Sequence, residues 1–292
     1  MLSSTLFIMA TALSPSSHAC PINHLDLEAI SRQYHTSHTS SYSPSLVSEI
    51  DFNEMVQKTE AIYKPLFESH GLTLRIEADW KSETENAYSD AEGKTRLVYL
   101  NGGYARHPLM TKDAYQSVIC HEIGHHLGGF PHEMGSPWAS VEGEADYYST
   151  LKCMKLVMNA DPLNQSIANQ LDLPDVIKAQ CKAQFPAPDA YAICLRSAKA
   201  SEEYGRVNAS LATPNARKPV SLLTPENRRS ILTNMSYPST QCRVDTKLQG
   251  ALCNVSPLIA IGYSDPTVGT CGAQNYYELG ARPTCWFDPF DK

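Results

Sequence analysis

The chain has 292 residues, of which 42% are hydrophobic and 19% are charged, which is enough to bury one large core or two smaller ones. The formal net charge of −7 is spread along the sequence, so composition excludes a basic surface for nucleic acid or anionic lipid. The sequence contains no run of about 18 apolar residues, which predicts no transmembrane helix in the mature chain.

Residues 1–19 are typical of a secretory signal peptide. Leu6–Leu13 is a short apolar run, and the small residues Ser17 and Ala19 suit cleavage before Cys20. Because no Lys or Arg precedes the apolar run, a buried N-terminal helix is the alternative. Export would place the chain in the periplasm or outside the cell. Cys20 could then carry a lipid anchor, although Ser17 is not the aliphatic residue of a lipobox.

Nine cysteines favour an oxidising compartment and a set of disulfides. All nine lie beyond the predicted cleavage site, and their odd number leaves one unpaired, with Cys20 and Cys120 as the two candidates. The spacings predict two short disulfide loops that brace the C-terminal region, Cys242 to Cys253 and Cys271 to Cys285. The sequence lacks the paired C-x-x-C of a cysteine zinc site.

Apolar periodicity and turn residues predict the following elements in chain order: a helix over 51–69, strands over 72–78 and 96–101, and helices over 112–127, 141–158, 173–185, 190–211 and 225–235. The expected caps are Asp51 with Glu54 for the first helix, Thr111 for the helix over 112–127, and Ser140 for the next. Residues 81–94 and 130–137 are expected to be loops, and the tail from Tyr237 is loop-rich.

This order predicts an α+β fold, in which a small sheet packs on the helix over 112–127 and on the helix that follows it. We divide the chain into the signal peptide (1–19), a catalytic core (20–160), and a helical, cysteine-rich region (161–292) packed on that core.

The helix over 112–127 contains His121, Glu122 and His125, which match the pattern H-E-x-x-H. Residues four apart lie about 40° apart around a helix, so both imidazoles leave the same face one turn apart. This spacing can place two nitrogens on one Zn²⁺, with Glu122 beside the remaining coordination position. The pattern also occurs by chance in unrelated helices, so a zinc site requires a third ligand.

The sequence Glu142-Gly143-Glu144-Ala145-Asp146 supplies the third ligand at the start of the next predicted helix. Glu142 and Asp146 share a face, so one carboxylate could bind zinc while the other accepts the free ring N–H of a ligating histidine. Glu144 lies about 200° from Glu142 around the helix. We assign Glu142 as the ligand because only it is in register with Asp146.

His132 is the alternative third ligand. Metzincins carry H-E-x-x-H-x-x-G-x-x-H, and Gly128 stands at the required glycine. The third histidine would then fall on Pro131, one residue before His132. A ligand in a loop could tolerate this shift, but it would leave the pairing of Glu142 with Asp146 unexplained.

The two motifs together resemble those of gluzincin zinc metallopeptidases, and most closely the HtpX/CAAX-protease-like group, whose second helix carries Glu-x-x-Ala-Asp. The resemblance covers about residues 96–158. It implies a zincin-like core with Zn²⁺ as cofactor, His121, His125 and Glu142 as ligands, Glu122 as general base, and Asp146 behind a ligating histidine. The chain looks more like soluble periplasmic members of the BepA type than like membrane-spanning ones. It lacks their tetratricopeptide repeats, so their biological role does not carry over.

The resulting hypothesis is an exported zinc-dependent metalloendopeptidase that cleaves a protein or peptide substrate with a zinc-bound water and Glu122 as base. The strand over 96–101 is either a sheet edge that binds extended substrate or an ordinary central strand. An oxyanion donor is expected among Tyr147, Tyr148, His132 and Arg106.

Two alternatives belong to other functional classes: a zinc amidase acting on cell-wall peptides, and a non-catalytic zinc-containing binding protein. Glu122 argues against the second, because a structural zinc site needs no base. In the C-terminal region, Arg243 and Asp245 are expected to form an internal ion pair.

Overall fold

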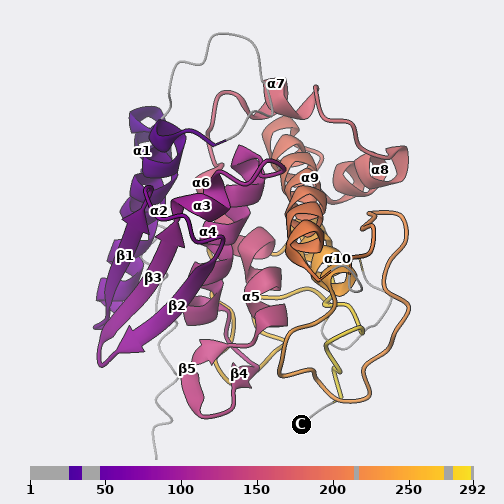
Figure 1. Cartoon of the computed structure of the whole chain (residues 1–292). Helices are drawn as coiled ribbons and strands as arrows, with labels where there is room; N and C mark the ends of the chain where they lie inside the picture. Colours follow the sequence, from indigo (N-terminus) through magenta and orange to yellow (C-terminus); the bar gives the residue numbers. More distant parts are fainter. Residues whose placement is uncertain (1–25, 35–46, 214–216, 273–278, 291–292) are drawn as a thin grey trace, which may run out of the picture.

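The computed structural model describes residues 26–34, 47–213, 217–272 and 279–290 (Figure 1). The predicted signal peptide and Cys20 lie outside these residues. The described elements are α1 (Leu27–Gln33), α2 (Glu49–Ser69), β1 (Thr73–Asp79), β2 (Ala87–Glu92), β3 (Thr95–Asn101), α3 (Gly102–Ala105), α4 (Lys112–Leu127), β4 (His132–Glu133), β5 (Ser136–Ser140), α5 (Glu142–Tyr148), the π-helical turn η2 (Ser149–Cys153), α6 (Met154–Val157), α7 (Asn164–Ala168), α8 (Asp175–Gln184), α9 (Pro188–Leu211) and α10 (Thr240–Leu252). The predicted α+β fold is therefore confirmed.

The main sheet has the order β1-β3-β2, with β1 parallel and β2 antiparallel to β3. The strand predicted over 96–101 is thus the central strand: of the two alternatives left open by the sequence, the central strand is confirmed and the free edge is wrong. The prediction also missed β2, because its sequence Ala87-Tyr88-Ser89-Asp90-Ala91-Glu92 is mostly polar and resembles a loop. It forms a strand because it pairs along its whole length with β3, whose Leu97, Val98 and Leu100 are buried.

The helix caps are confirmed in part. Thr111 Oγ1 accepts the N–H of Ala114 at 3.2 Å, and α4 ends at Gly128, both as predicted. The capping box of α2 instead joins Ser48 and Asp51: Ser48 Oγ accepts the N–H of Asp51 at 3.2 Å, and Asp51 Oδ2 accepts the N–H of Ser48 at 3.0 Å. The helix therefore begins two residues earlier than predicted.

A two-stranded hairpin, β4 and β5, replaces the loop predicted over 130–137. Ser140 does not cap the following helix, because its Oγ donates to Gly129 O at 2.8 Å instead. The N-cap of α5 is Val141, with no side-chain cap. The chain predicted as one helix over 141–158 continues as α5, η2 and α6, so the position of the helix was right but its π-helical turn was missed.

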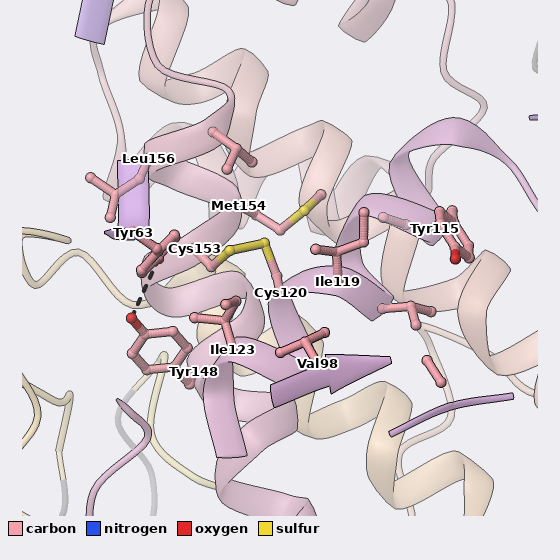
Figure 2. Close-up of a cluster of buried hydrophobic side chains, with 14 of the residues drawn as sticks. Tyr63, Val98, Tyr115, Ile119, Cys120, Ile123, Tyr148, Cys153, Met154 and Leu156 are labelled. Carbon is pink, nitrogen blue, oxygen red and sulfur yellow. Dashed lines mark hydrogen bonds between the residues drawn. A yellow bond between two sulfur atoms is a disulfide. The ribbon is translucent and has the colours of Figure 1, made fainter. Parts of the chain in front are cut away.

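Four disulfides join the eight cysteines that the structure describes: Cys120–Cys153, Cys181–Cys194, Cys242–Cys285 and Cys253–Cys271. Cys120 is therefore not the unpaired thiol; its disulfide lies in the main core, where it links α4 to η2 (Figure 2). The predicted Cys242–Cys253 loop is wrong because these residues stand at opposite ends of α10. The helical rise separates them by about 16 Å, far beyond disulfide reach.

The helix predicted over 225–235 does not form. Backbone N–H groups of this segment bond instead to the last part of the chain, from Ser230 N to Thr284 O at 2.8 Å and from Asn234 N to Trp286 O at 2.7 Å. The nearest helix is α10, in the tail that was expected to be loop-rich.

The sheet lies along one side of α4 (Figure 1). On the other side, α9 packs against α4 and α10 packs against α5. The main core includes Tyr204, Val207 and Cys253, so it extends across the predicted domain boundary at residue 160. Trp286 is fully buried against Gly143 of α5. The C-terminal region thus packs directly on the helix that carries Glu142.

Gly143→Ala is expected to lower the free energy of unfolding by about 1–3 kcal/mol, because a Cβ there would lie 2.3 Å from Cδ2 of Trp286. Urea unfolding measures this loss. In a Trp286→Leu background the same substitution should cost less, since the clashing ring is gone. An equal cost in both backgrounds would show that the contact does not limit residue size at position 143.

Candidate metal centre

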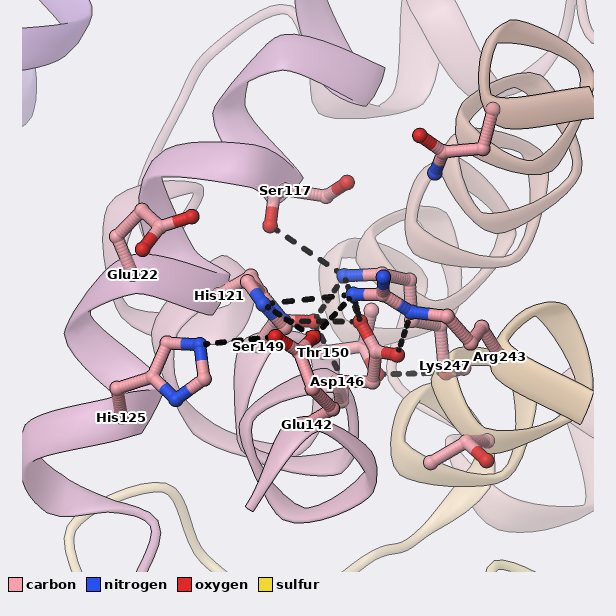
Figure 3. Close-up of polar contacts among 12 residues, drawn as sticks. Ser117, His121, Glu122, His125, Glu142, Asp146, Ser149, Thr150, Arg243 and Lys247 are labelled. Carbon is pink, nitrogen blue, oxygen red and sulfur yellow. Dashed lines mark hydrogen bonds and ion pairs between the residues drawn. The ribbon is translucent and has the colours of Figure 1, made fainter. Parts of the chain in front are cut away.

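His121 and His125 project from α4 towards Glu142, the first residue of α5 (Figure 3). His121 Nε2 lies 3.3 Å from Glu142 Oε2, and His125 Nε2 lies 3.8 Å from Glu142 Oε1. One potential ligand atom from each residue falls within 4.8 Å of the others, and all three residues are buried. This group could hold a metal ion, and it is the one such group of three among the described residues.

Gly124, between the two histidines, allows α5 to approach α4. A Cβ at this position would lie 2.7 Å from Ala145 O, closer than side chains tolerate. The approach brings Glu142 to the histidine face of α4. The close contact between the two helices therefore explains why position 124 is a glycine.

Contacts to each Nδ1 indicate which ring nitrogen is available as a ligand. His125 Nδ1 lies 2.8 Å from the carbonyl oxygen of Ser140, so Nδ1 carries the proton and donates it. His121 Nδ1 lies 2.9 Å from Asp146 Oδ1, although its N–H is not well aligned with that oxygen. Both rings thus leave Nε2 facing Glu142, and Asp146 occupies the position expected for it behind His121.

Arg243 of α10 is a member of this site that the sequence analysis did not find. Its Nε lies 2.6 Å from Asp146 Oδ2, and its Nη2 lies 3.0 Å from Glu142 Oε2 and 3.4 Å from His121 Nε2. Lys247, one turn further along α10, places Nζ 3.2 Å from Asp146 Oδ1 (Figure 3). Arg243 and Lys247, two cations on one face of α10, therefore hold Glu142 and Asp146 of α5.

The expected ion pair between Arg243 and Asp245 is wrong. Residues two apart on a helix point to nearly opposite sides, and α10 is a helix here. Asp245 instead accepts hydrogen bonds from Gln241 Nε2 and from the backbone N–H of Glu226, both at 2.7 Å. The i, i+4 spacing of Arg243 and Lys247 could have indicated that both cations lie on one helix face, but only if the segment had been predicted as a helix.

The charged groups around the site determine the protonation of Asp146, Glu142 and His121. Burial opposes ionisation of Asp146, but Arg243 and Lys247 hold its pKa well below its usual range. Burial likewise opposes ionisation of Glu142, but Arg243 and the histidines lower its pKa. Burial lowers the pKa of His121, yet the two carboxylates outweigh it and raise the pKa to about 8. Both carboxylates are therefore ionised at neutral pH.

Glu122 is buried beside the three potential ligands but is not one of them. Ser89 of β2 donates its hydroxyl to Glu122 Oε2 at 2.8 Å and also lies 2.9 Å from the backbone oxygen of Glu122. The carboxylate is thus positioned by β2, the edge strand of the sheet, where the sequence predicts a loop.

These side chains line a cavity of about 320 Å³. The start of β2 forms one wall, the β4–β5 hairpin lies near His125, and α9 contributes Tyr204 and Asn208. Tyr237 and Arg243 also line the cavity. The cavity opens onto Glu122 and onto all three potential metal ligands.

The four residues expected to supply an oxyanion donor lie outside this cavity, so that expectation is wrong. Tyr147 donates to Gly280 O at 2.6 Å and Tyr148 to Tyr63 Oη at 3.3 Å, while Arg106 binds Glu83 and the backbone near Trp80. His132 Nε2 lies 2.9 Å from Tyr263 O. The structure therefore brings Glu142, and not His132, to the two histidines.

Glu144 points away from the metal centre, as its helical position predicts. Its carboxylate is fully buried and forms two bonds with Arg282, at 2.5 and 2.7 Å. Glu144 thus ties α5 to the C-terminal segment, while Glu142 on the other face remains available to a metal.

No family model, curated protein or solved structure matches the chain. The function is therefore inferred from the geometry of the site. Within the described ranges, no helix is long and apolar enough to cross a membrane.

Proposed function

We propose that this chain is a zinc-dependent metalloendopeptidase with a zincin-like catalytic core of the gluzincin type. The observation that carries the proposal is the convergence of His121, His125 and Glu142 beside Glu122, a buried carboxylate that is not a ligand. Two imidazoles and one carboxylate are a donor set that catalytic zinc uses, with one position left for water or substrate. A purely structural site would be expected to have four protein ligands and no adjacent base.

His121, His125 and Glu142 would hold the ion, and Asp146 and Ser140 would fix the two imidazoles through their Nδ1 atoms. Bound zinc supplies Lewis-acid activation of a water and polarisation of the scissile carbonyl. Glu122 accepts the proton of the attacking water and delivers it to the leaving amine. Ser89 holds the carboxylate of Glu122 in place for both transfers.

Tyr237 and Arg243 are the donors best placed to stabilise the oxyanion, because both line the cavity next to Glu142. Partial desolvation by the cavity and the neighbouring charges of Glu142 and Glu122 raise the pKa of Tyr237, so the phenol keeps its proton at neutral pH. A neutral phenol and a guanidinium can both donate hydrogen bonds to developing negative charge.

The edge strand for an extended substrate is β2. It pairs with β3 on one side and with no other strand among the described residues, and its start forms a wall of the cavity. A peptide added to this edge would pass directly in front of Glu122, since Ser89 of β2 bonds that side chain. We therefore assign substrate binding to β2 and not to the strand over 96–101.

Export is part of the proposal. Four disulfides among the described cysteines suit the periplasm or the cell exterior, because cytosolic thiols are kept reduced. The predicted signal peptide points to the same compartments.

Zinc content of purified variants tests the assignment of the third ligand. Glu142→Gln is expected to lose most of its bound zinc, whereas the matched variant His132→Gln should keep it, because only Glu142 faces both Nε2 atoms. Plasma mass spectrometry measures zinc per chain, and circular dichroism checks that each variant is folded. Full zinc in Glu142→Gln together with loss in His132→Gln would reverse the assignment.

A further inference from the structure

Three residues of the β4–β5 hairpin line the catalytic cavity without any part in the metal chemistry, and two of them, Glu133 and Trp138, have large side chains; the third is Ala139. The hairpin is attached to the metal centre, since His125 Nδ1 contacts the carbonyl of Ser140 in β5. Arg243 contacts His121, so it lies at the other end of the pair of histidines. Glu133 and Trp138 therefore belong to the end of the cavity near His125.

The carboxylate of Glu133 has no compensating charge, because it forms no ion pair or side-chain hydrogen bond with any described residue. The other two carboxylates of the cavity differ: Glu122 accepts from Ser89, and Glu142 is paired with Arg243. A half-buried carboxylate without a partner attracts a cation into its neighbourhood.

Two aromatic rings, those of Trp138 and Tyr88, line the same cavity as this carboxylate. The ring of Trp138 stacks on His126 at 5.2 Å, and His126 is itself held by a contact of 3.1 Å between Nε2 and Leu97 O. Tyr88 of β2 belongs to another part of the cavity lining; its ring stacks on Tyr99 at 4.4 Å and the residue remains 48% exposed. Aromatic rings held in place in the same cavity as an unpaired carboxylate form a favourable environment for an ammonium or guanidinium group.

We propose that this end of the cavity is a subsite for a cationic side chain of the substrate, lysine or arginine, and that Glu133 determines this specificity. The inference rests on the proposed peptidase function and adds the class of residue that the enzyme selects near the scissile bond. The carboxylate of Glu133 pairs with the cation, and Trp138 and Tyr88 cover its aliphatic stem.

The test compares kcat/KM for a peptide with Lys or Arg near the cleaved bond and the same peptide with Gln at that position. The wild-type protein is expected to prefer the cationic peptides by about tenfold, which corresponds to about 1.4 kcal/mol. Glu133→Gln should reduce this ratio to about one, and Glu133→Arg should favour a peptide with Glu instead. Zinc content and unfolding should not change. Glu92→Gln is the matched control, because Glu92 is exposed on β2 and does not line the cavity.

Zinc-dependent cleavage with the same preference in wild type and Glu133→Gln, or with no preference in wild type, would overturn the subsite and leave the peptidase proposal standing. Absence of zinc-dependent cleavage for every peptide in the series would overturn the proposed function, and the subsite with it.

Discussion

Glu122→Gln is expected to lower kcat/KM for peptide hydrolysis by about 10²–10⁴-fold while zinc content remains that of the wild type. Gln keeps the shape of the side chain and the contact with Ser89 but cannot accept a proton from water. Glu122 is not among the three converging ligands, so its replacement should not release the metal. Hydrolysis of a fluorogenic peptide and zinc analysis of the same sample measure both quantities.

Ser89→Ala provides a matched comparison for this result. It keeps the carboxylate and removes only the hydroxyl that positions it, so its activity should fall between those of wild type and Glu122→Gln. Near-normal turnover in Glu122→Gln would refute the assignment of the base. The two alternatives from the sequence are also separated here: a non-catalytic binding protein would show no activity in the wild type, and an amidase would act on muropeptides but not on peptides such as casein fragments.

Asp146→Ala is expected to lower the free energy of unfolding by about 3–5 kcal/mol, the largest stability effect in the site. The carboxylate is fully buried and contacts both Lys247, which is fully buried, and Arg243, whose side chain is only 11% exposed. Its removal leaves two cations without their common partner in a medium of low polarity. Chemical denaturation of wild type and variant at neutral pH measures the difference.

The physical cause of this loss can be separated from the loss of packing. Adding Lys247→Met to Asp146→Ala should recover part of the stability, since one of the two unpaired charges disappears. Because the pKa of Asp146 is lowered in the folded state, its contribution is present above the unfolded pKa of about 4 and decreases as the pH falls below it. The unpaired charges would not be the cause if wild type and Asp146→Ala differed in stability as much at pH 3 as at neutral pH, and if the double variant recovered none of the lost stability.

Local sequence patterns were sufficient to predict the helix that carries His121 and His125 and the carboxylate of Glu142 that faces them. The four-residue spacings of His121 with His125 and of Glu142 with Asp146 depend only on helix geometry, which the structure reproduces. Thr111 and Gly128 mark the ends of α4 through contacts within a few residues. These features are encoded within short segments and do not depend on distant parts of the chain.

The missed features depend on partners far away in the sequence. The polar strand β2 is stabilised by pairing with β3, and Arg243 reaches Asp146 across 97 residues. The pairing of Cys242 with Cys285 requires α10 and the last segment of the chain to be placed first. The spacing of residues within one helix or strand cannot predict such contacts. They supply a wall of the cavity, the cation beside Glu142, and the two cations that contact Asp146.

Titration of zinc into chelator-stripped wild-type protein, followed by the rate of peptide hydrolysis, tests the central claim most directly. The stripped protein should be inactive, and activity should rise to a plateau at about one equivalent of zinc per chain. Hydrolysis that is independent of zinc, or a folded protein that binds zinc without gaining any hydrolytic activity, would contradict the assignment of a catalytic zinc site.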